Sequence, residues 1–263
     1  MRTISSLMNL SGRKALITGG AGHIGRVTAE TLVELGAQVA LVDLDANACK
    51  AEAKRMGHKT LAFPCDLADE KTIRQVILNA IAGMKGLDIL IHCAAYVGTT
   101  KAAGWAVPFE EQSVAAWEMA MRVNLTAAFV MAQEAQPALA SSGHGSIILF
   151  SSTYGMVGPD MSLYENTKMA NPAGYNASKG GLLQLTRYLA TVMAPRIRVN
   201  AISPGGVWRN QPDEFRRRYE ARTPLKRLAI EEDLKGAVAY LAGDLSAYVT
   251  GQNLVVDGGW TAW

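Results

Sequence analysis

The chain has 263 residues, of which 49% are apolar, so it is long enough to bury one sizeable core. Its formal net charge of +3 is small and dispersed, which excludes the concentrated basic surface of a nucleic-acid-binding protein. Three widely spaced cysteines without a Cys-x-x-Cys pair, no secretory leader and no apolar run of membrane-spanning length predict a cytoplasmic protein with no membrane partner.

Short apolar segments alternate with stretches of helical apolar spacing along the whole chain. This alternation predicts an α/β fold of the Rossmann type: a doubly wound parallel sheet with helices on both faces, in a single domain over 1–263. Ligands of such sheets bind at the carboxyl ends of the strands. The predicted strands are 14–18, 38–42, 60–63, 88–91, 146–150, 198–202 and 253–256.

A nucleotide-binding pattern opens the chain. The first predicted strand is followed by a glycine-rich turn at 19–25 and by helical spacing over 26–35. This arrangement aims backbone N–H groups and a helix N-terminus at a pyrophosphate. The turn residues expected to bind a dinucleotide are Gly19, Gly22, His23, Ile24 and Gly25.

Asp43 follows the second predicted strand. An acid at this point accepts hydrogen bonds from both adenosine ribose hydroxyls and repels a 2′-phosphate. The glycine turn contains no Lys or Arg that could receive that phosphate, and neither flanks Asp43. The sequence therefore predicts NAD(H) in preference to NADP(H). The alternative, a tight strand–helix turn with a solvated aspartate, is disfavoured by the context.

Tyr175 and Lys179 introduce a predicted helix over 180–193. Four residues apart on a helix, the phenol and the ammonium share one face. At about 4 Å and an effective dielectric of about 20, the cation favours the phenolate by roughly 4 kcal/mol, about three pK units. We therefore expect Lys179 to lower the pKa of Tyr175 toward the working pH, where the phenol exchanges a proton with an alcohol or carbonyl.

Together, the glycine turn and the Tyr-x-x-x-Lys motif resemble the short-chain dehydrogenase/reductase family, and the resemblance covers nearly the whole chain. Asn124 stands where the family keeps a helix asparagine, and Ser152, after the strand at 146–150, best fits its catalytic serine. The stretches 198–206 and 249–259 resemble the segment over the nicotinamide and the carboxyl end of classical members. By resemblance, the catalytic residues are Asn124, Ser152, Tyr175 and Lys179. Further cofactor-binding residues are Asp66, Leu67, Ala94, Pro204, Gly205 and Val207, with Tyr175 and Lys179.

The resemblance implies hydride transfer between NAD(H) and a secondary alcohol or ketone, sugar- or polyol-like, in a homotetramer or homodimer without a metal. Tyr175 would exchange the hydroxyl proton, and Ser152 would hydrogen-bond the same oxygen. Lys179 would hold the nicotinamide ribose, and Asn124 would position a water that links Lys179 to solvent. Trp260 and Trp263 would suit a subunit contact or the edge of a neighbour's pocket.

Two departures point to the extended subfamily, whose members include nucleotide-sugar epimerases and dehydratases. His23 replaces the usual middle glycine of the turn, and the segment between Ser152 and Tyr175 is longer than classical members have. The chain length, Pro204-Gly205 and the carboxyl end favour a classical enzyme with an enlarged substrate loop. An epimerase or dehydratase with tightly bound NAD is the alternative. The expected substrate loops are 95–112, 153–174 and 207–228.

A second Tyr-x-x-x-Lys motif, Tyr164 to Lys168, lies inside the enlarged loop. Pro172 closely follows it and no apolar helical pattern continues, so we expect Tyr164 to line the pocket or pack, and Tyr175 to be the catalyst. The basic segment 209–227 could meet an anionic substrate, but its interleaved acids favour an ordinary solvated helix.

The family usually carries Asn-Asn-Ala-Gly after the fourth strand, where this chain has His92-Cys93-Ala94-Ala95. A packed histidine at a strand end is favoured over a bound catalytic group. His23, His58 and His144 show no metal-ligand spacing with one another or with cysteine, so no metal site is predicted.

Overall fold

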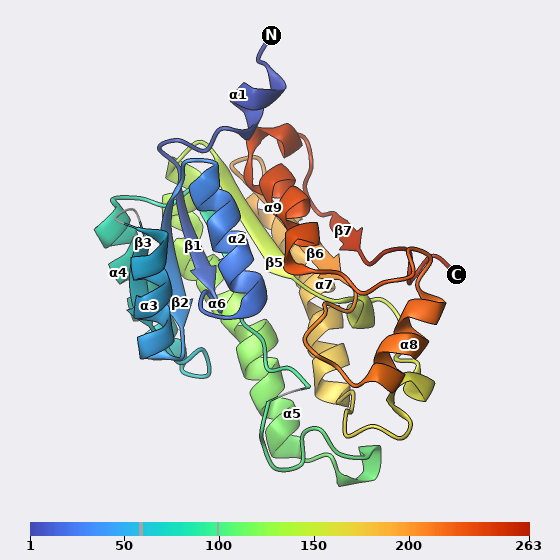
Figure 1. Cartoon of the computed structure of the whole chain (residues 1–263). Coiled ribbons are helices and arrows are strands. Elements are labelled where there is room, and N and C mark those ends of the chain that lie inside the picture. Colours follow the sequence, from blue (N-terminus) through green and yellow to red (C-terminus); the bar gives the residue numbers. More distant parts are fainter. Residues whose placement is uncertain (58–59, 99) are drawn as a thin grey trace.

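The structure of the protein, a computed structural model, describes residues 1–57, 60–98 and 100–263. Its centre is a seven-stranded parallel sheet in the order β3-β2-β1-β4-β5-β6-β7, with helices on both faces (Figure 1). The predicted doubly wound, Rossmann-type single domain is confirmed. The strands are β1 (Lys14–Thr18), β2 (Gln38–Asp43), β3 (Thr60–Pro64), β4 (Ile89–His92), β5 (Gly145–Phe150), β6 (Ile197–Pro204) and β7 (Asn253–Val256).

Helices complete the fold within the described residues. The α-helices are α1 (Ile4–Met8), α2 (His23–Glu34), α3 (Ala46–Met56), α4 (Glu70–Met84), α5 (Val114–Met121), α6 (Ala127–Ser141), α7 (Ala173–Met193), α8 (Asp213–Arg222) and α9 (Lys235–Ala242). A π-helical turn, η2 (Arg122–Thr126), joins α5 to α6. Short 3-10 turns are η1 (Phe109–Glu111), η3 (Thr153–Gly155), η4 (Met161–Tyr164), η5 (Glu231–Leu234) and η6 (Asp244–Ser246). None of the helices described is long and apolar enough to cross a membrane.

Two apolar cores sandwich the sheet, because successive residues of a strand point to opposite faces and a parallel sheet is covered on both. In β1, Leu16 belongs to one core, whereas Ala15 and Ile17 belong to the other. Side chains from α4, α6 and α7 fill the first core, and side chains from α2, α3 and α9 fill the second. This burial on both faces explains the near-continuous apolar runs from which the strands were predicted.

β1 and β7 have the predicted bounds, and the bounds of the other strands differ from the predictions by one or two residues. β4 ends at His92, which pairs with Thr18 of β1 and Leu149 of β5, so His92 lies within the sheet and not after it. β6 continues to Pro204 because Pro204 still pairs with Val256 of β7. His92 and Pro204 therefore lie inside the sheet, whereas the sequence placed them just after their strands.

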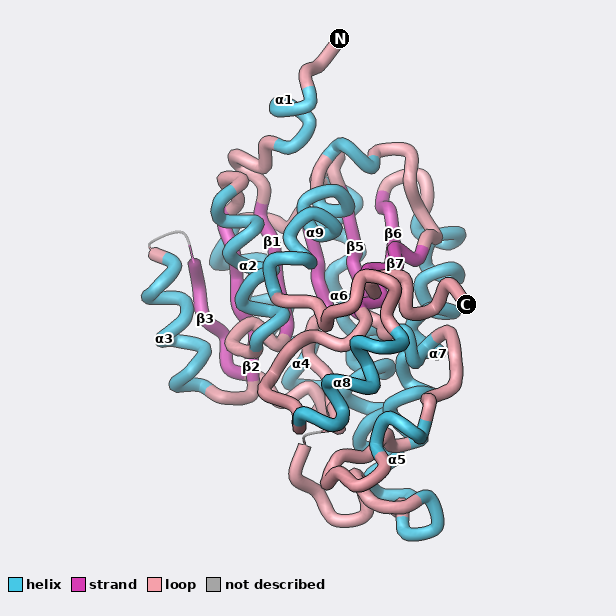
Figure 2. The backbone as a smooth tube through the Cα atoms, turned by 45° about the vertical axis from the view of Figure 1, so that its right-hand side comes forward, coloured by secondary structure: helices cyan, strands magenta, loops and turns pink. Residues whose placement is uncertain are grey.

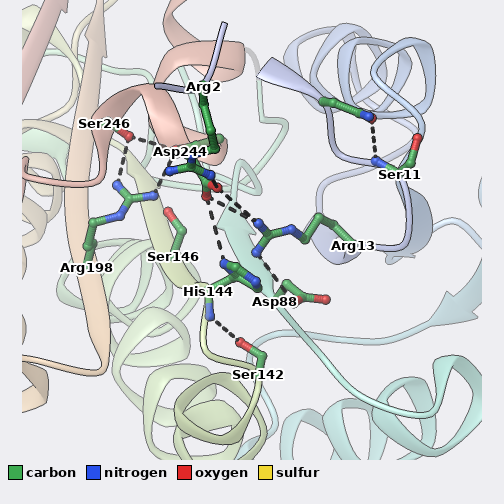
Figure 3. A network of polar contacts seen from close by, with 12 residues as sticks. Arg2, Ser11, Arg13, Asp88, Ser142, His144, Ser146, Arg198, Asp244 and Ser246 are labelled. Carbon is green, nitrogen blue, oxygen red and sulfur yellow. Dashed lines mark hydrogen bonds and ion pairs between the residues drawn. The ribbon is translucent and has the colours of Figure 1, made fainter. Parts of the chain in front are cut away.

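The two ends of the sheet carry different elements. The N-terminus and α1 lie at the amino ends of the strands, whereas α5 and α8 lie beyond the carboxyl ends (Figures 1 and 2). At the amino end, Asp244 of η6 accepts hydrogen bonds from Arg2 and Arg13, at 2.6 and 3.2 Å (Figure 3). Arg198 at the start of β6 donates to Ser246 Oγ at 2.8 Å. This network ties the N-terminal segment to η6, away from the carboxyl end where ligands of such sheets bind.

Candidate active site

The glycine turn after β1 is shaped by close backbone packing. A Cβ on Gly25 would lie 1.9 Å from the carbonyl oxygen of Gly19, a distance that no side chain tolerates. Gly19 has φ +66°, and a Cβ there would lie 2.8 Å from Cα of Ala94, in the loop after β4. The turn therefore requires glycine at both positions, and it brings the first and fourth strand ends together.

The turn leaves hydrogen-bond donors available at the start of α2. α2 begins at His23, its N-cap is Gly22, and none of the described side chains caps it. The first N–H groups of a helix have no intrahelical acceptor, so those of Ile24 and Gly25 remain free to bind an anion. Asp43, the last residue of β2, accepts a hydrogen bond from the Ala21 N–H at 2.9 Å. The residues present therefore fit the pyrophosphate and the adenosine ribose of a dinucleotide.

His23 faces the segment that follows β6. Its Nδ1 lies 3.6 Å from Glu231 Oε1, and Arg209 donates to the same carboxylate at 2.6 Å. Burial lowers the pKa of His23, and the positive charge of Arg209 lowers it further. The residue that replaces the usual glycine thus connects the turn to η5 through Glu231.

The remaining predicted cofactor residues also lie along the carboxyl edge of the sheet. Asp66 and Leu67 follow β3, and Ala94 follows β4. Pro204 ends β6, the Gly205 N–H donates to the Val256 carbonyl at 3.0 Å, and Val207 pairs with Ala229. The structure thus brings the whole predicted set to one edge, and its contacts with a cofactor stay a prediction.

Tyr175 and Lys179 lie on the first two turns of α7. The start of this helix is supported by the segment before α5, because Gln112 Oε1 accepts a hydrogen bond from the Ala173 N–H at 2.9 Å. Lys179 is 2% exposed, and its Nζ lies 5.7 Å from the centre of the Tyr175 ring. Ser152, two residues past β5, is also buried. The predicted phenol, ammonium and hydroxyl therefore meet at the carboxyl end of the sheet.

The predicted lowering of the Tyr175 pKa is wrong for this structure. Burial raises the pKa of Tyr175, although a hydrogen bond with Ser152 acts in the opposite direction. Lys179 does not offset this effect: its Nζ lies 5.7 Å from the centre of the Tyr175 ring and donates to the carbonyl of Phe150 at 2.6 Å. Burial also lowers the pKa of Lys179 to about 8. The four-residue spacing predicted that Tyr175 and Lys179 share a helix face. It could not predict that burial shifts both pKa values or that Lys179 Nζ points to Phe150.

Asn124 lies in the π-turn η2 and is fully buried. Its side-chain amide donates to Ser178 Oγ at 2.9 Å and to the Tyr96 carbonyl at 3.2 Å, and its side-chain oxygen accepts from the Tyr96 N–H. Its main-chain carbonyl is in contact with His92. Asn124 therefore joins the loop after β4 to α7. π-turns inside helices frequently mark functional sites.

His92 is completely buried, as expected for a packed residue at a strand end. Burial lowers its pKa to about 3, and the charge of Lys179 acts in the same direction. The imidazole is consequently neutral at physiological pH. Among the described residues, no group of three or more His, Cys, Asp or Glu side chains is arranged to hold a metal ion.

An aromatic cluster beside the site was not predicted as a unit. Tyr164 donates to the Tyr154 hydroxyl at 3.0 Å and accepts from Asn171 Nδ2 at 3.3 Å. Trp260 stacks on Tyr219 with ring centres 5.8 Å apart, and Tyr154 packs edge-on against Trp260. The position of Tyr154, two residues after Ser152, was the available sequence signal. The expected subunit contact of Trp260 is wrong, because the side chain is 2% exposed within its own chain.

The second Tyr-x-x-x-Lys motif is not on a continuous helix. Tyr164 ends the short turn η4, and Lys168 is exposed on the loop beyond it. The structural part of that prediction is confirmed. The basic segment is extensively ion-paired, in line with the expected solvated helix: Arg216 pairs with Asp213, Arg222 with Asp160 and Arg227 with Asp233.

Comparisons with known proteins agree with this geometry. A sequence profile for the family described as "Enoyl-(Acyl carrier protein) reductase" matches residues 19–261. The cis-4-hydroxycyclohexanecarboxylate dehydrogenase of Sinomonas cyclohexanicum is 36% identical, over 95% of this chain and 97% of that protein. The chain belongs to the short-chain dehydrogenase/reductase family. It is an oxidoreductase of the classical type, and the family binds a nicotinamide dinucleotide.

Two further members of the short-chain dehydrogenase/reductase family are similar along their whole length. L-rhamnose 1-dehydrogenase (NAD(P)(+)) of Sphingomonas sp. (strain SKA58) is 32% identical, over 95% of this chain and 96% of that protein. The crystal structure of a short-chain dehydrogenase from Leptospira borgpetersenii serovar Hardjo-bovis with bound NAD+ superposes with a TM-score of 0.84 and 33% identity. That superposition covers 99% of this chain and 96% of the other.

Proposed function

We propose that this protein is an NAD(H)-dependent dehydrogenase/reductase that interconverts a secondary alcohol, sugar- or polyol-like, and its ketone. The observation that carries the proposal is the meeting of Tyr175, Lys179 and Ser152 at the same sheet edge as the glycine turn and Asp43. One set of residues suits a dinucleotide, and the other suits the exchange of one proton with a substrate oxygen.

The preference for NAD(H) rests on Asp43. Its carboxylate is fixed beside the turn by the Ala21 N–H, where it would accept the adenosine ribose hydroxyls and repel a 2′-phosphate. The Leptospira neighbour with bound NAD+ supports this preference. The name of the Sphingomonas relative includes both cofactors, so membership of the family alone does not decide between them.

The bound nicotinamide supplies the hydride acceptor or donor. In the oxidative direction, the nicotinamide would supply the hydride acceptor, and the Tyr175 phenolate would accept the proton of the substrate hydroxyl, so that a secondary alcohol gives a ketone. Ser152 donates a hydrogen bond to the same oxygen as charge develops on it. Lys179 supplies a positive charge one helical turn from the phenol, which opposes the effect of burial when its head group approaches the tyrosine.

The enlarged segment 153–174, with 95–112 and 207–228, would form the substrate pocket. Tyr154 and Tyr164 lie within electrostatic range of Tyr175, and their hydroxyls form a chain with Asn171. Hydroxyl groups inside an aromatic wall suit a substrate with both an apolar ring face and additional hydroxyl groups. The cyclohexane and sugar dehydrogenases among the relatives support this substrate class.

We also propose a cytoplasmic homotetramer or homodimer. Apolar side chains remain exposed on α6 and α7, where Phe129, Tyr188 and Val192 are 40, 58 and 52% exposed. Such side chains suit a helix-to-helix contact between subunits. Light scattering coupled to size exclusion tests the assembly, and a monomer at micromolar concentration would contradict it.

The decisive experiment follows NADH or NADPH formation, with NAD or NADP respectively and a panel of cyclohexanols, polyols, sugars and nucleotide sugars. Tyr175→Phe should lose about 10³-fold in kcat/KM, because it lacks the proton-exchanging hydroxyl. Tyr164→Phe, the matched control in the second motif, should keep at least about a tenth of the activity. The opposite ranking would overturn the assignment, and an isomerised or dehydrated sugar without NADH would favour the epimerase or dehydratase.

A further inference from the structure

His92 stands where the family usually has asparagine, and its two ring nitrogens have different partners. Nε2 lies 3.1 Å from the Asn124 carbonyl, and Nδ1 lies 2.8 Å from Thr18 Oγ1. A carbonyl oxygen can only accept, so Nε2 must carry the proton. The neutral ring then accepts at Nδ1 from the Thr18 hydroxyl. The two contacts together define a single tautomer.

The hydrogen bonds continue in both directions from the imidazole. On the cofactor side, Thr18 Oγ1 accepts from the Ala94 N–H at 3.4 Å. On the catalytic side, the imidazole contacts the main-chain carbonyl of Asn124. The side-chain amide of the same residue donates to Ser178 Oγ, and Ser178 Oγ donates to the main-chain carbonyl of Tyr175 at 2.8 Å. A continuous chain of polar contacts therefore runs from the end of β1 to the backbone of the proposed catalytic tyrosine.

Every donor and acceptor in this chain is used without conflict. The two N–H groups of the Asn124 amide bond to Ser178 and Tyr96, and the amide oxygen accepts from Tyr96. His92 has one donor and one acceptor, which match the carbonyl on one side and the hydroxyl on the other. A fully satisfied buried network of this kind is rigid, because breaking any bond leaves a buried polar group without a partner.

We propose that His92 is a positioning residue: as a neutral Nε2–H imidazole, it holds the π-turn at Asn124 and thereby fixes Tyr175 relative to the β1 end and the glycine turn. The inference rests on the proposed hydride transfer, since it assigns His92 a role in placing the group that exchanges the proton. A displacement of about 1 Å at a reacting group can cost about 100-fold in rate.

The surroundings of the ring keep it neutral. It is completely buried between β1, β5 and η2, and the charged group acting on it from α7 is Lys179, whose positive charge disfavours an imidazolium. The Val123 and Asn124 carbonyls favour protonation but do not outweigh burial. We therefore expect no change in the charge of His92 between about pH 5 and about pH 9.

The first test needs no substitution in the test protein. In ¹⁵N-histidine-labelled protein, we expect one imidazole with Nε2–H tautomer shifts that stay constant from about pH 5 to about pH 9. His92→Asn identifies this signal by its loss. A His92 ring that titrates in this range, or that carries its proton on Nδ1, would overturn the inference. This readout is independent of turnover, so an inactive protein with the expected signal would count against the proposed function alone.

The second test separates positioning from stability. His92→Asn retains one donor and one acceptor, whereas His92→Leu leaves Thr18 Oγ1 and the Asn124 carbonyl without this partner. We expect His92→Leu to lower kcat by about 10- to 100-fold with KM changed less than about threefold, and His92→Asn to recover most of kcat. The apparent pKa of the kcat profile should shift in His92→Leu and return in His92→Asn, a change that lost stability alone would not produce.

His144→Asn is the matched control, because His144 lies 3.9 Å from Asp244 at the other end of the sheet. It should leave kcat and its pH profile unchanged. Equal loss of kcat in folded His92→Leu and His92→Asn, or an unchanged kcat and pH profile in both, would contradict the positioning role.

Discussion

At the amino end of the sheet, charges meet opposite charges in partly exposed pairs: Asp244 lies between Arg2 and Arg13, and Arg13 also approaches Asp88 (Figure 3). At the carboxyl end, the Lys179 cation is buried and donates to the neutral carbonyl of Phe150. The first arrangement stabilises the folded state modestly. The second carries a desolvation cost, which is tolerated where a proton must be moved. Substitutions at the two ends should therefore separate stability from activity.

Lys179→Met should have the largest effect: it should lower kcat and raise the free energy of unfolding. We expect kcat to fall by about 100-fold or more, because the charge near Tyr175 is lost. We expect the free energy of unfolding near neutral pH to rise by about 1–3 kcal/mol, because the variant no longer buries a cation. Lys168→Met, in the exposed second motif, should change neither quantity.

The pH dependence of stability follows from the same lysine. Its folded pKa of about 8 lies below the ordinary value of 10.5, so between these values the unfolded chain binds more protons than the folded chain. The free energy of unfolding of the wild type therefore rises with pH through this window. Below about pH 8, Lys179 is charged in the folded protein and the full cost of burying the cation is present. Denaturant titrations should show the Lys179→Met advantage shrinking above about pH 8. A constant advantage would contradict the depressed pKa.

Gly25→Ala tests the carboxyl-end turn. The new Cβ would overlap the Gly19 carbonyl, so the turn must shift, and we expect NAD affinity to fall by at least about 10-fold with a loss of about 1–3 kcal/mol of stability. Calorimetric titration of NAD measures the first and thermal unfolding the second. Gly236→Ala, on α9 where an added Cβ meets no atom within 4 Å, should leave NAD binding unchanged and slightly raise stability.

Asp43→Ser should alter the choice of cofactor with a smaller effect. Without the carboxylate, the ratio of kcat/KM for NAD to that for NADP should fall by about 10-fold or more, because repulsion of the 2′-phosphate is removed. Asp45→Asn is a suitable control, since asparagine retains the side-chain oxygen that caps α3. An unchanged ratio in Asp43→Ser would show that another group selects the cofactor.

Asp244→Asn should have the smallest effect and act on stability alone. The Arg2 and Asp244 side chains are 58 and 22% exposed, so loss of these pairs should cost at most about 1 kcal/mol, and less at high salt. Thermal unfolding at two salt concentrations measures the loss, and kcat/KM should stay within about twofold of wild type. A fall in kcat/KM as large as in Lys179→Met would show that the two ends are coupled.

Features encoded by neighbouring residues could be predicted from the sequence. The strands are apolar runs because both faces of the sheet are covered, and Tyr175 and Lys179 share a face because they are one helical turn apart. The Gly25 requirement likewise follows from a local turn. The fold, the glycine turn and the Tyr175–Lys179 pair therefore followed from short-range patterns, whereas Asn124 and Ser152 were identified by the family resemblance.

Features that depend on distant partners could not be predicted. Burial shifts the pKa values of both Tyr175 and Lys179, and this burial cannot be seen in Tyr-x-x-x-Lys spacing. His92 meets Asn124 only through the sheet and the π-turn. Trp260 meets Tyr219 because the carboxyl end folds back on α8. Packing decided each of these outcomes.

The contact that supports the start of α7 couples substrate specificity to the rate of turnover. Gln112, which bonds to the Ala173 N–H, belongs to the proposed substrate segment 95–112, and Trp105 of that segment packs against Gly174. A change in this segment that admits a new substrate also alters the support of the helix bearing Tyr175. New specificities should therefore arise with slow turnover at first, and libraries that hold Trp105 and Gln112 constant should yield a larger fraction of active variants.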